Sequence, residues 1–228
     1  MRETVQEKIK KKLDDVRRHG FVATSRKFLR DHLYSHRRHV FLERDLSKPF
    51  KSFAQKANWT PRMLKGRQEL DKFRLHFASS INGIADLFDR GCIASVAFVD
   101  DELVAFIWYH TDELHEAKYN YVFRMADDEV YQTAGYIIPK HRGTFLALEG
   151  VKYSQEYFRD KGFKKTVCVV DTEAIATMRL HVNLDFEERG ALLHTRKLLF
   201  YRWSRVEEYE GRRFEHLKWP QRAAAGDG

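Results

Sequence analysis

The sequence predicts an α/β (α+β) protein with a mixed, mostly antiparallel sheet of about seven strands, flanked by helices and preceded by N-terminal helices. Three observations lead to this fold class. Runs rich in β-branched and aromatic residues alternate with stretches of helical period. Two such runs, 92–99 and 103–110, are separated by three acidic residues, which favours an antiparallel hairpin. After Pro139 the period changes to helical and then back to strand, which adds one βαβ-like step.

The first 38 residues are predicted to be a basic helical extension. An apolar side chain recurs there at helical spacing, at Val5, Ile9, Leu13 and Val16. A second short helix is expected over 24–36. Residues 39–46 then alternate in polarity, which is typical of a strand. We expect this strand to open a globular domain over 39–205, followed by a C-terminal tail, 206–228.

A long helical stretch is expected between the first strand and the hairpin. Thr60 can cap a helix, and Pro61 suits its first position because the missing N–H has no partner there in any case. The helical pattern continues to about Asp89 and is expected to break near 79–83.

The second half of the chain supplies the remaining strands and two helices. Runs 119–125 and 130–138 are expected to extend the sheet, and a helix follows Pro139. Asp171 is a suitable cap for a helix after the strand 165–170. The last two strands are expected over 186–193 and 196–203, where an exposed end strand can pair two copies into a homodimer.

Composition excludes several classes of protein. The 228 residues are 43% hydrophobic and 14% aromatic, with 12 Gly and 4 Pro, which excludes a disordered or collagen-like chain. Cys92 and Cys168 lie in apolar runs without a CxxC pair, so neither a disulfide framework nor a cysteine zinc site is expected. No apolar run is long enough for a transmembrane segment, and a cytoplasmic location is the default expectation.

Positive charge is concentrated in the first third of the chain. Residues 1–75 hold 21 Lys and Arg against 9 Asp and Glu, whereas the whole chain has a net charge of +8. Such a segment can attract an acidic partner or an anionic surface, although a merely solvated basic surface is the plainer interpretation. His32, His36 and His39 lack the further ligands of a metal motif, so no metal site is expected.

The turn after the strand 130–138 is the most functional-looking part of the sequence. Pro139 ends the strand, and Lys140, His141, Arg142 and Gly143 stand directly before a helix. A helix N-terminus offers unpaired N–H groups to an anion, and Arg142 adds a bidentate donor. The pattern predicts a phosphate-binding turn, with an ordinary surface turn as the alternative.

This turn and a later helix resemble the GNAT superfamily of N-acyltransferases. The family's acyl-coenzyme A loop reads P-x-x-[Q/R]-x-x-G-x-[G/A], to which Pro139, Arg142 and Ala147 correspond. In the later helix Thr177, His181 and Phe186 stand at matching positions, and the order of elements over about 38–205 is also the family's. Three family positions differ, with Phe145, Ala174 and Asp185 replacing the usual glycine, asparagine and glycine.

The resemblance implies direct attack of a primary amine on acetyl-CoA or another acyl-CoA. Glu129 would then be the base, with a simple turn carboxylate as the alternative. His181 would protonate the leaving thiolate, with a packed helix histidine as the alternative, and Tyr136 is another proton-transfer candidate. The implied cofactor-binding residues are Ile137, Ile138, Arg142, Gly143, Thr144, Phe145, Leu146 and Ala147.

The sequence is also compatible with two other functions. Phe145 could close the loop, because glycine there lets the backbone approach the pyrophosphate, and the protein would then be a catalytically inactive, GNAT-shaped binding protein. Alternatively, the basic residues 1–75 could attract an acidic acyl carrier protein that delivers a long acyl chain. The acceptor is expected to be a small-molecule or peptide amine, and no residue pattern identifies it more closely.

Overall fold

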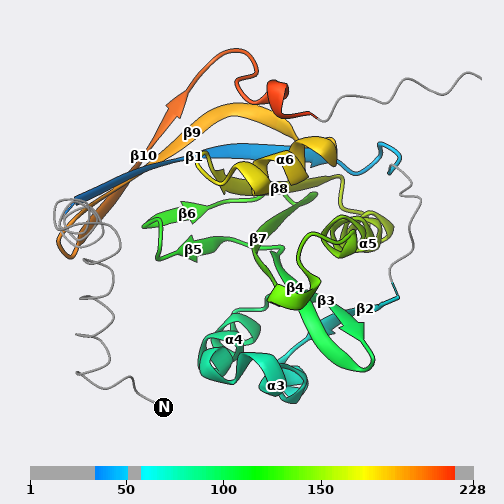
Figure 1. Cartoon of the computed structure of the whole chain (residues 1–228). Coiled ribbons are helices and arrows are strands. Elements are labelled where there is room, and N and C mark those ends of the chain that lie inside the picture. Colours follow the sequence, from blue (N-terminus) through cyan, green and yellow to red (C-terminus); the bar gives the residue numbers. More distant parts are fainter. Residues whose placement is uncertain (1–33, 51–57, 219–228) are drawn as a thin grey trace, which may run out of the picture.

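The computed structural model describes residues 34–50 and 58–218, which form one large sheet with helices on both faces (Figure 1). The sheet has eight strands in the order β10-β9-β1-β8-β7-β4-β3-β2. Its strands are β1 Tyr34–Asp45, β2 Thr60–Lys65, β3 Ile93–Val99, β4 Glu102–His110, β7 Glu129–Ile137, β8 Lys165–Asp171, β9 Glu187–Leu198 and β10 Tyr201–Glu208. Every neighbouring pair is antiparallel except β7 and β8, so the predicted fold class is confirmed.

Helices and a small hairpin cover the sheet. The α-helices are α3 Arg74–Phe77, α4 Ile81–Asp89, α5 Leu146–Asp160 and α6 Ile175–Asn183. Short 3-10 helices are η2 Arg67–Phe73, η3 Ala78–Ser80, η4 Pro139–His141 and η5 Glu215–Leu217. A separate two-stranded sheet consists of β5 Leu114–Glu116 and β6 Tyr121–Phe123. Among the described helices, none has the length and apolar character needed to cross a membrane.

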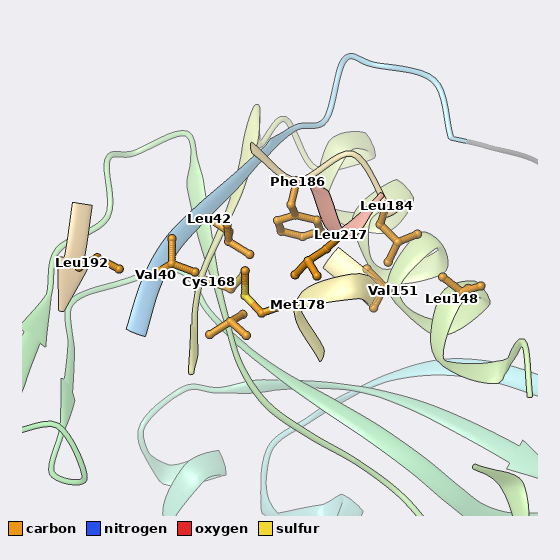
Figure 2. Packing of buried hydrophobic residues seen from close by; sticks show 11 residues of the cluster. Val40, Leu42, Leu148, Val151, Cys168, Met178, Leu184, Phe186, Leu192 and Leu217 are labelled. Carbon is orange, nitrogen blue, oxygen red and sulfur yellow. The ribbon is translucent and has the colours of Figure 1, made fainter. Parts of the chain in front are cut away.

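The period-two alternation of the central strands divides the core between the two faces of the sheet. Val40 and Leu42 of β1 point to the cluster beneath α5 and α6, which also contains Met178 (Figure 2). Phe41, between them in sequence, packs in the opposite cluster with Leu114 of the β5–β6 hairpin. Because both faces are buried there, β3 and β4 consist largely of apolar residues.

A third cluster, rich in aromatic rings, attaches η2, α3 and α4 to β3 and β4. Phe73 is fully buried at its centre, and its ring stacks on Trp108 with the centroids 6.0 Å apart. Phe77 and Phe88 approach the same ring edge-on. The helical segment is therefore held by aromatic packing rather than by its own length, since α3 is a single turn.

The predicted helix start at Thr60-Pro61 is wrong, because these residues open β2. β2 is the edge strand of the sheet, where a proline without an N–H is tolerated. The helical stretch begins only after Gly66, whose positive φ of 82° reverses the chain. The expected break near 79–83 is confirmed, since η3 separates α3 from α4.

Other element boundaries also differ from prediction. β1 begins at Tyr34, inside the segment expected to be a helical extension, and the rest of that segment lies outside the described residues. Residues 119–125 do not extend the large sheet, because β6 pairs with β5 alone. The last turn lies at Leu199-Phe200 rather than near 194, so β9 and β10 are longer and later than predicted.

The predicted Asp171 cap is likewise wrong. The Asp171 carboxylate accepts a hydrogen bond from the Glu173 N–H at 2.9 Å, and α6 begins two residues later with no side-chain cap. The other carboxylate oxygen pairs with Arg37 at 3.2 Å. Asp171 therefore shapes the turn between β8 and α6 and links it to β1.

Candidate active site

The two parallel strands of the sheet separate part-way along their length. β7 pairs with β8 from Glu129↔Lys165 to Gln132↔Cys168, and β7 then continues to Ile137 beside β4 only. The β4–β7 register shifts between Ile107 and Tyr109, which marks a β-bulge in the same region. A bulge bends its strand, so the bulge accounts for the divergence of β7 from β8.

The divergence opens a cavity of about 440 Å³ between β7, α5 and α6. Most of its lining is apolar. The lining residues from these three elements are Gln132, Thr133, Gly135, Tyr136, Ile137, Leu146, Ala147, Gly150, Val151, Ala176, Thr177, Leu180 and His181. Arg142 from the preceding turn, Trp59, and residues of β3 and β4 complete the wall. A strand edge facing a cavity offers backbone N–H and C=O groups to a ligand that carries amides.

The turn before α5 places one guanidinium at the cavity. Arg142 Nε donates to the Ile137 carbonyl at 3.0 Å, and its guanidinium carbon lies 5.3 Å from the centre of the Tyr136 ring. This bond uses Nε and orients the guanidinium, whose two terminal NH₂ groups can still donate to an anion. Gly143 has a φ of 75°, which an L side chain rarely adopts, so this turn requires glycine. Thr144 closes the turn by donating to the His141 carbonyl at 2.8 Å.

Phe145 stands immediately before the first residue of α5. It has helical backbone angles, its side chain is 38% exposed, and it does not line the cavity. The ring therefore leaves the cavity open. The phenylalanine that replaces the family's glycine therefore does not fill the space that a ligand in the cavity would occupy.

His181 lies at the α6 side of the cavity as a neutral imidazole. Its Nδ1 is 2.8 Å from the Thr177 carbonyl, which can only accept, so Nδ1 carries the proton. Nε2 then presents its lone pair, and the Gln132 amide donates to it at 3.0 Å. Desolvation lowers the pKa of His181, with a smaller opposing contribution from the Thr177 hydrogen bond. In this state His181 can accept a proton but has none to give from Nε2.

Gln132 links His181 to the middle of α5 through buried polar groups. The Tyr109 hydroxyl lies 3.4 Å from the Gln132 amide oxygen and 2.5 Å from the Ser154 hydroxyl. Ser154 in turn donates to backbone carbonyls of its own helix, of Gly150 at 3.0 Å and Val151 at 2.9 Å. Desolvation raises the pKa of Tyr109, which keeps the phenol protonated. These contacts fix the orientation of the amide that faces His181.

Glu129 lies outside the cavity. It stands at the first residue of β7, three residues before Gln132, and the period-two alternation turns it, with Tyr131, to the opposite face of the sheet from Gln132. Its carboxylate is buried and pairs with Arg189 at 2.9 Å, beside a second cavity of about 260 Å³. The sheet itself therefore lies between Glu129 and the other predicted catalytic residues, His181 and Tyr136, which line the first cavity, so Glu129 does not face that site.

The structure brings together six of the predicted site residues: Tyr136, Ile137, Arg142, Leu146, Ala147 and His181. Ile138, Gly143 and Thr144 form the turn without lining the cavity, and the Ile138 N–H is used in a hydrogen bond to the Val104 carbonyl at 3.0 Å. Sequence reasoning missed Trp59, Gln132 and Gly150. The one available signal was Gln132, a polar residue between Tyr131 and Thr133 in an otherwise apolar strand.

No cluster of metal-ligating side chains occurs within residues 34–50 and 58–218. Both cysteines are buried and free. Desolvation raises the pKa of Cys92 to about 12 and that of Cys168 still higher, so neither thiol is activated as a nucleophile.

Comparison with solved structures finds similar folds at low sequence identity. A conserved protein of unknown function from Staphylococcus epidermidis ATCC 12228 aligns with a TM-score of 0.51 and 9% identity, covering 78% of this chain and 68% of that one. This likeness shows the fold alone. No protein-family model and no curated protein matches the sequence.

Two acetyltransferases align less closely. A GCN5-related N-acetyltransferase from Kribbella flavida has a TM-score of 0.48 and 15% identity, over 85% of this chain and 65% of that chain. The aminoglycoside N-acetyltransferase AAC(6')-Iy, in complex with a bisubstrate analog, has a TM-score of 0.46 and 15% identity, over 64% of this chain and 98% of that chain. The chain thus spans less than two thirds of the Kribbella protein's length.

Proposed function

We propose that this protein is an N-acyltransferase that moves an acyl group, in the first place acetyl, from acyl-CoA to a primary amine. The observation that carries the proposal is the opening between β7 and β8, which joins an exposed arginine turn to an apolar cavity with a neutral histidine on its wall. Acyl-CoA has an anionic end for the arginine turn, amides for the strand edge and an acyl group for the apolar cavity.

The donor would bind from the turn inwards. Arg142 and the N–H groups of Ala147 and Leu148 would receive the pyrophosphate, since a helix N-terminus carries partial positive charge. The Leu146 N–H already donates to the Thr144 hydroxyl. The edge of β7 from Thr133 to Ile137 would pair with the amides of the pantetheine arm. The acyl group would lie among the apolar side chains of the cavity.

Acyl transfer then requires one proton to be taken and one to be given. The amine nitrogen forms a bond to the thioester carbonyl carbon, and the carbon–sulfur bond breaks. The bound amine would displace the Gln132 amide from the single lone pair of His181 Nε2, which would then accept the amine proton. The Tyr136 hydroxyl would protonate the departing thiolate. The proposal gives His181 the role of acceptor rather than donor, because its Nδ1–H is committed to Thr177.

One observation favours a second candidate, an acyl-CoA-binding protein without catalysis. Among the described residues that line the cavity there is no Asp or Glu, and the strongest base that they supply is an imidazole whose pKa is already lowered. Such a protein would bind the donor and release no thiol when amines are supplied. Binding and turnover therefore need separate measurements.

The first test is thermal unfolding of the full chain with CoA, acetyl-CoA and a long-chain acyl-CoA. A ligand at about 100 times its dissociation constant adds about 2.7 kcal/mol, which raises the unfolding midpoint by a few degrees. A shift with one donor supports the proposal and identifies the acyl class. No shift with any donor refutes it. Thiol release with a panel of amines then distinguishes the enzyme from the binding protein.

A further inference from the structure

Three strands of the large sheet extend beyond the rest of the sheet as an arm, defined here as residues 34–38 of β1, 194–198 of β9 and 201–205 of β10 (Figure 1). β8 pairs with β1 only from His39 onwards, so these residues of β1 pair with β9 alone. The antiparallel register sets three residues side by side in each row. The arm is thus a short three-stranded sheet that ends in the turn Leu199-Phe200.

One face of the arm is exposed along its whole length. Directly opposed residues in antiparallel strands share a face, and the register gives three successive rows on this one. The rows are Tyr34, Leu198 and Tyr201, then His36, Arg196 and Trp203, then Arg38, His194 and Arg205. All but the half-buried His194 are exposed. The next row on this face, Val40 and Leu192, is buried in the core cluster under α6. The same face is therefore buried in the body of the protein and exposed on the arm.

Apolar residues are gathered at the very end of the arm. Phe200 is 90% exposed and Tyr201 70%, and Tyr34, Leu198 and Leu199 are about half exposed beside them. Exposed apolar groups in one contiguous patch mark an interaction site rather than ordinary surface. Leu199, in the turn between β9 and β10, has a φ of 55°, in the left-handed region.

Positive charge follows directly behind the apolar end. The arm contains six Lys and Arg residues and no Asp or Glu. Arg38, Arg196 and Arg205 lie on the exposed face. On the other face lie Arg37, Lys197 and Arg202, of which Arg37 pairs with Asp171 and Arg202 donates to the Ala117 carbonyl. Along the strands the basic residues begin next to the apolar row and reach about 13 Å behind it, at 3.3 Å for each residue. Partial desolvation lowers the pKa of His36, and the positive charge of Arg196 lowers it further.

We propose that the arm docks on an anionic lipid bilayer, with Phe200 and its apolar neighbours inserted and the basic residues at the level of the headgroups. An inserted apolar element reaches about 5–10 Å below the headgroup boundary, which matches an apolar end with charges set behind it. Trp203 stands beside Arg196 in the first row behind the apolar end, at the depth where interfacial tryptophans lie. Anionic lipid attracts Lys and Arg within a Debye length of the surface.

This arrangement favours lipid over single-stranded nucleic acid. Nucleic acid stacks its bases on aromatic rings across the face of a sheet. Here the most exposed groups lie at the end of the arm and include the aliphatic Leu198 and Leu199, which provide no stacking surface. Phe200 is in the turn, off the sheet face altogether.

The test is flotation of the full chain with phosphatidylcholine vesicles, with and without phosphatidylglycerol, at about 0.1 M salt. We expect binding only when phosphatidylglycerol is present. The double variant Phe200→Ser, Tyr201→Ser should weaken that binding at least tenfold. Leu75→Ser is the matched control, because Leu75 is also exposed, at 66%, but lies in α3 away from the arm. It should bind like the parent protein.

Two further double variants test whether vesicle binding depends on the positive charge of the arm or only on the net charge of the protein. Arg196→Gln with Arg205→Gln should weaken binding at least tenfold. Arg67→Gln with Arg124→Gln removes the same net charge from exposed residues elsewhere and should change it less than threefold. Equal losses in both pairs would overturn the proposal, since the arm would then have no special role.

Three other outcomes would also overturn it. Vesicle binding that the Phe200→Ser, Tyr201→Ser variant keeps would place the membrane contact elsewhere. Tight binding of a single-stranded RNA oligonucleotide, lost in that variant while vesicles do not bind, would make the arm a nucleic-acid surface. A dimer in sedimentation that the same variant dissociates, again without vesicle binding, would make the exposed β10 edge a self-association surface.

Discussion

Replacement of Arg142 by Gln tests the candidate active site most directly. Arg142 is exposed, its Nε donates to the Ile137 carbonyl at 3.0 Å, and its terminal NH₂ groups remain for a phosphate. A hydrogen bond to a charged group contributes about 1.5–3 kcal/mol, and each 1.4 kcal/mol is a tenfold change in affinity. Loss of the guanidinium should therefore weaken CoA binding about 10- to 150-fold, while the free energy of unfolding falls by no more than about 1 kcal/mol.

Calorimetry with two ligands makes this prediction specific. Pantetheine has the same arm as CoA but lacks the phosphates, so Arg142→Gln should leave its affinity unchanged. Lys140→Gln is the control, because it removes one positive charge from the same turn without removing the fork of donors. It should weaken CoA binding less than threefold. Unchanged CoA affinity in Arg142→Gln, or an equal loss for pantetheine, would refute the assignment of Arg142 to the phosphates.

Three further predictions concern the cavity, the aromatic core and acid stability. Gly150 lies in α5 with open space where a Cβ would be, so Gly150→Ala should raise the free energy of unfolding by about 0.5–1 kcal/mol and slightly reduce the room for an acyl group, measured by urea unfolding and by donor affinity. Phe73→Ala should cost about 3–5 kcal/mol in the same assay, whereas the exposed Leu75→Ala should cost less than about 0.5 kcal/mol, and similar losses would contradict the packing described. Desolvation lowers the pKa of both His39 and His110 to about 4. Between about pH 6.5 and pH 4 these histidines are therefore protonated in the unfolded chain but neutral in the folded one. As the pH falls through this range, each histidine lowers the free energy of unfolding by up to about 1.4 kcal/mol per pH unit. His39→Gln should reduce this slope, and an unchanged slope would show that His39 does not contribute.

The predictions that held were those carried by local pattern. The hairpin of β3 and β4 follows from two apolar runs around Asp100 and Asp101, which both adopt positive φ in the turn. The strand, proline and helix order around Pro139 was also recoverable, because each change of period marks an element boundary. The role of Arg142 as a donor to an anion stays a prediction; the bond from its Nε to the Ile137 carbonyl was not predicted.

The predictions that failed depended on contacts with distant segments. Thr60-Pro61 is a good helix start locally, yet pairing with β3 makes it an edge strand. Residues 121–123 have strand character, but their partner is β5 rather than the large sheet. The last turn was misplaced because β1 extends to Tyr34 and holds β9 in strand conformation as far as Leu198. In each case tertiary pairing overrode a local preference.

The sequence by itself determined the fold class, the hairpin and the strand-to-helix turn that contains Arg142. Each helix or strand with a buried face shows apolar residues at its own period in the sequence. Only the tertiary structure decided which of the candidate residues share a cavity. The pairing of β7 and the alternation of its side chains bring His181 and Tyr136 to one cavity and turn Glu129 to the opposite face of the sheet. The register between β1, β9 and β10 likewise collects apolar and basic residues from distant segments into one arm. Strand register and strand divergence are set by partners far apart in the chain, so no local period records them.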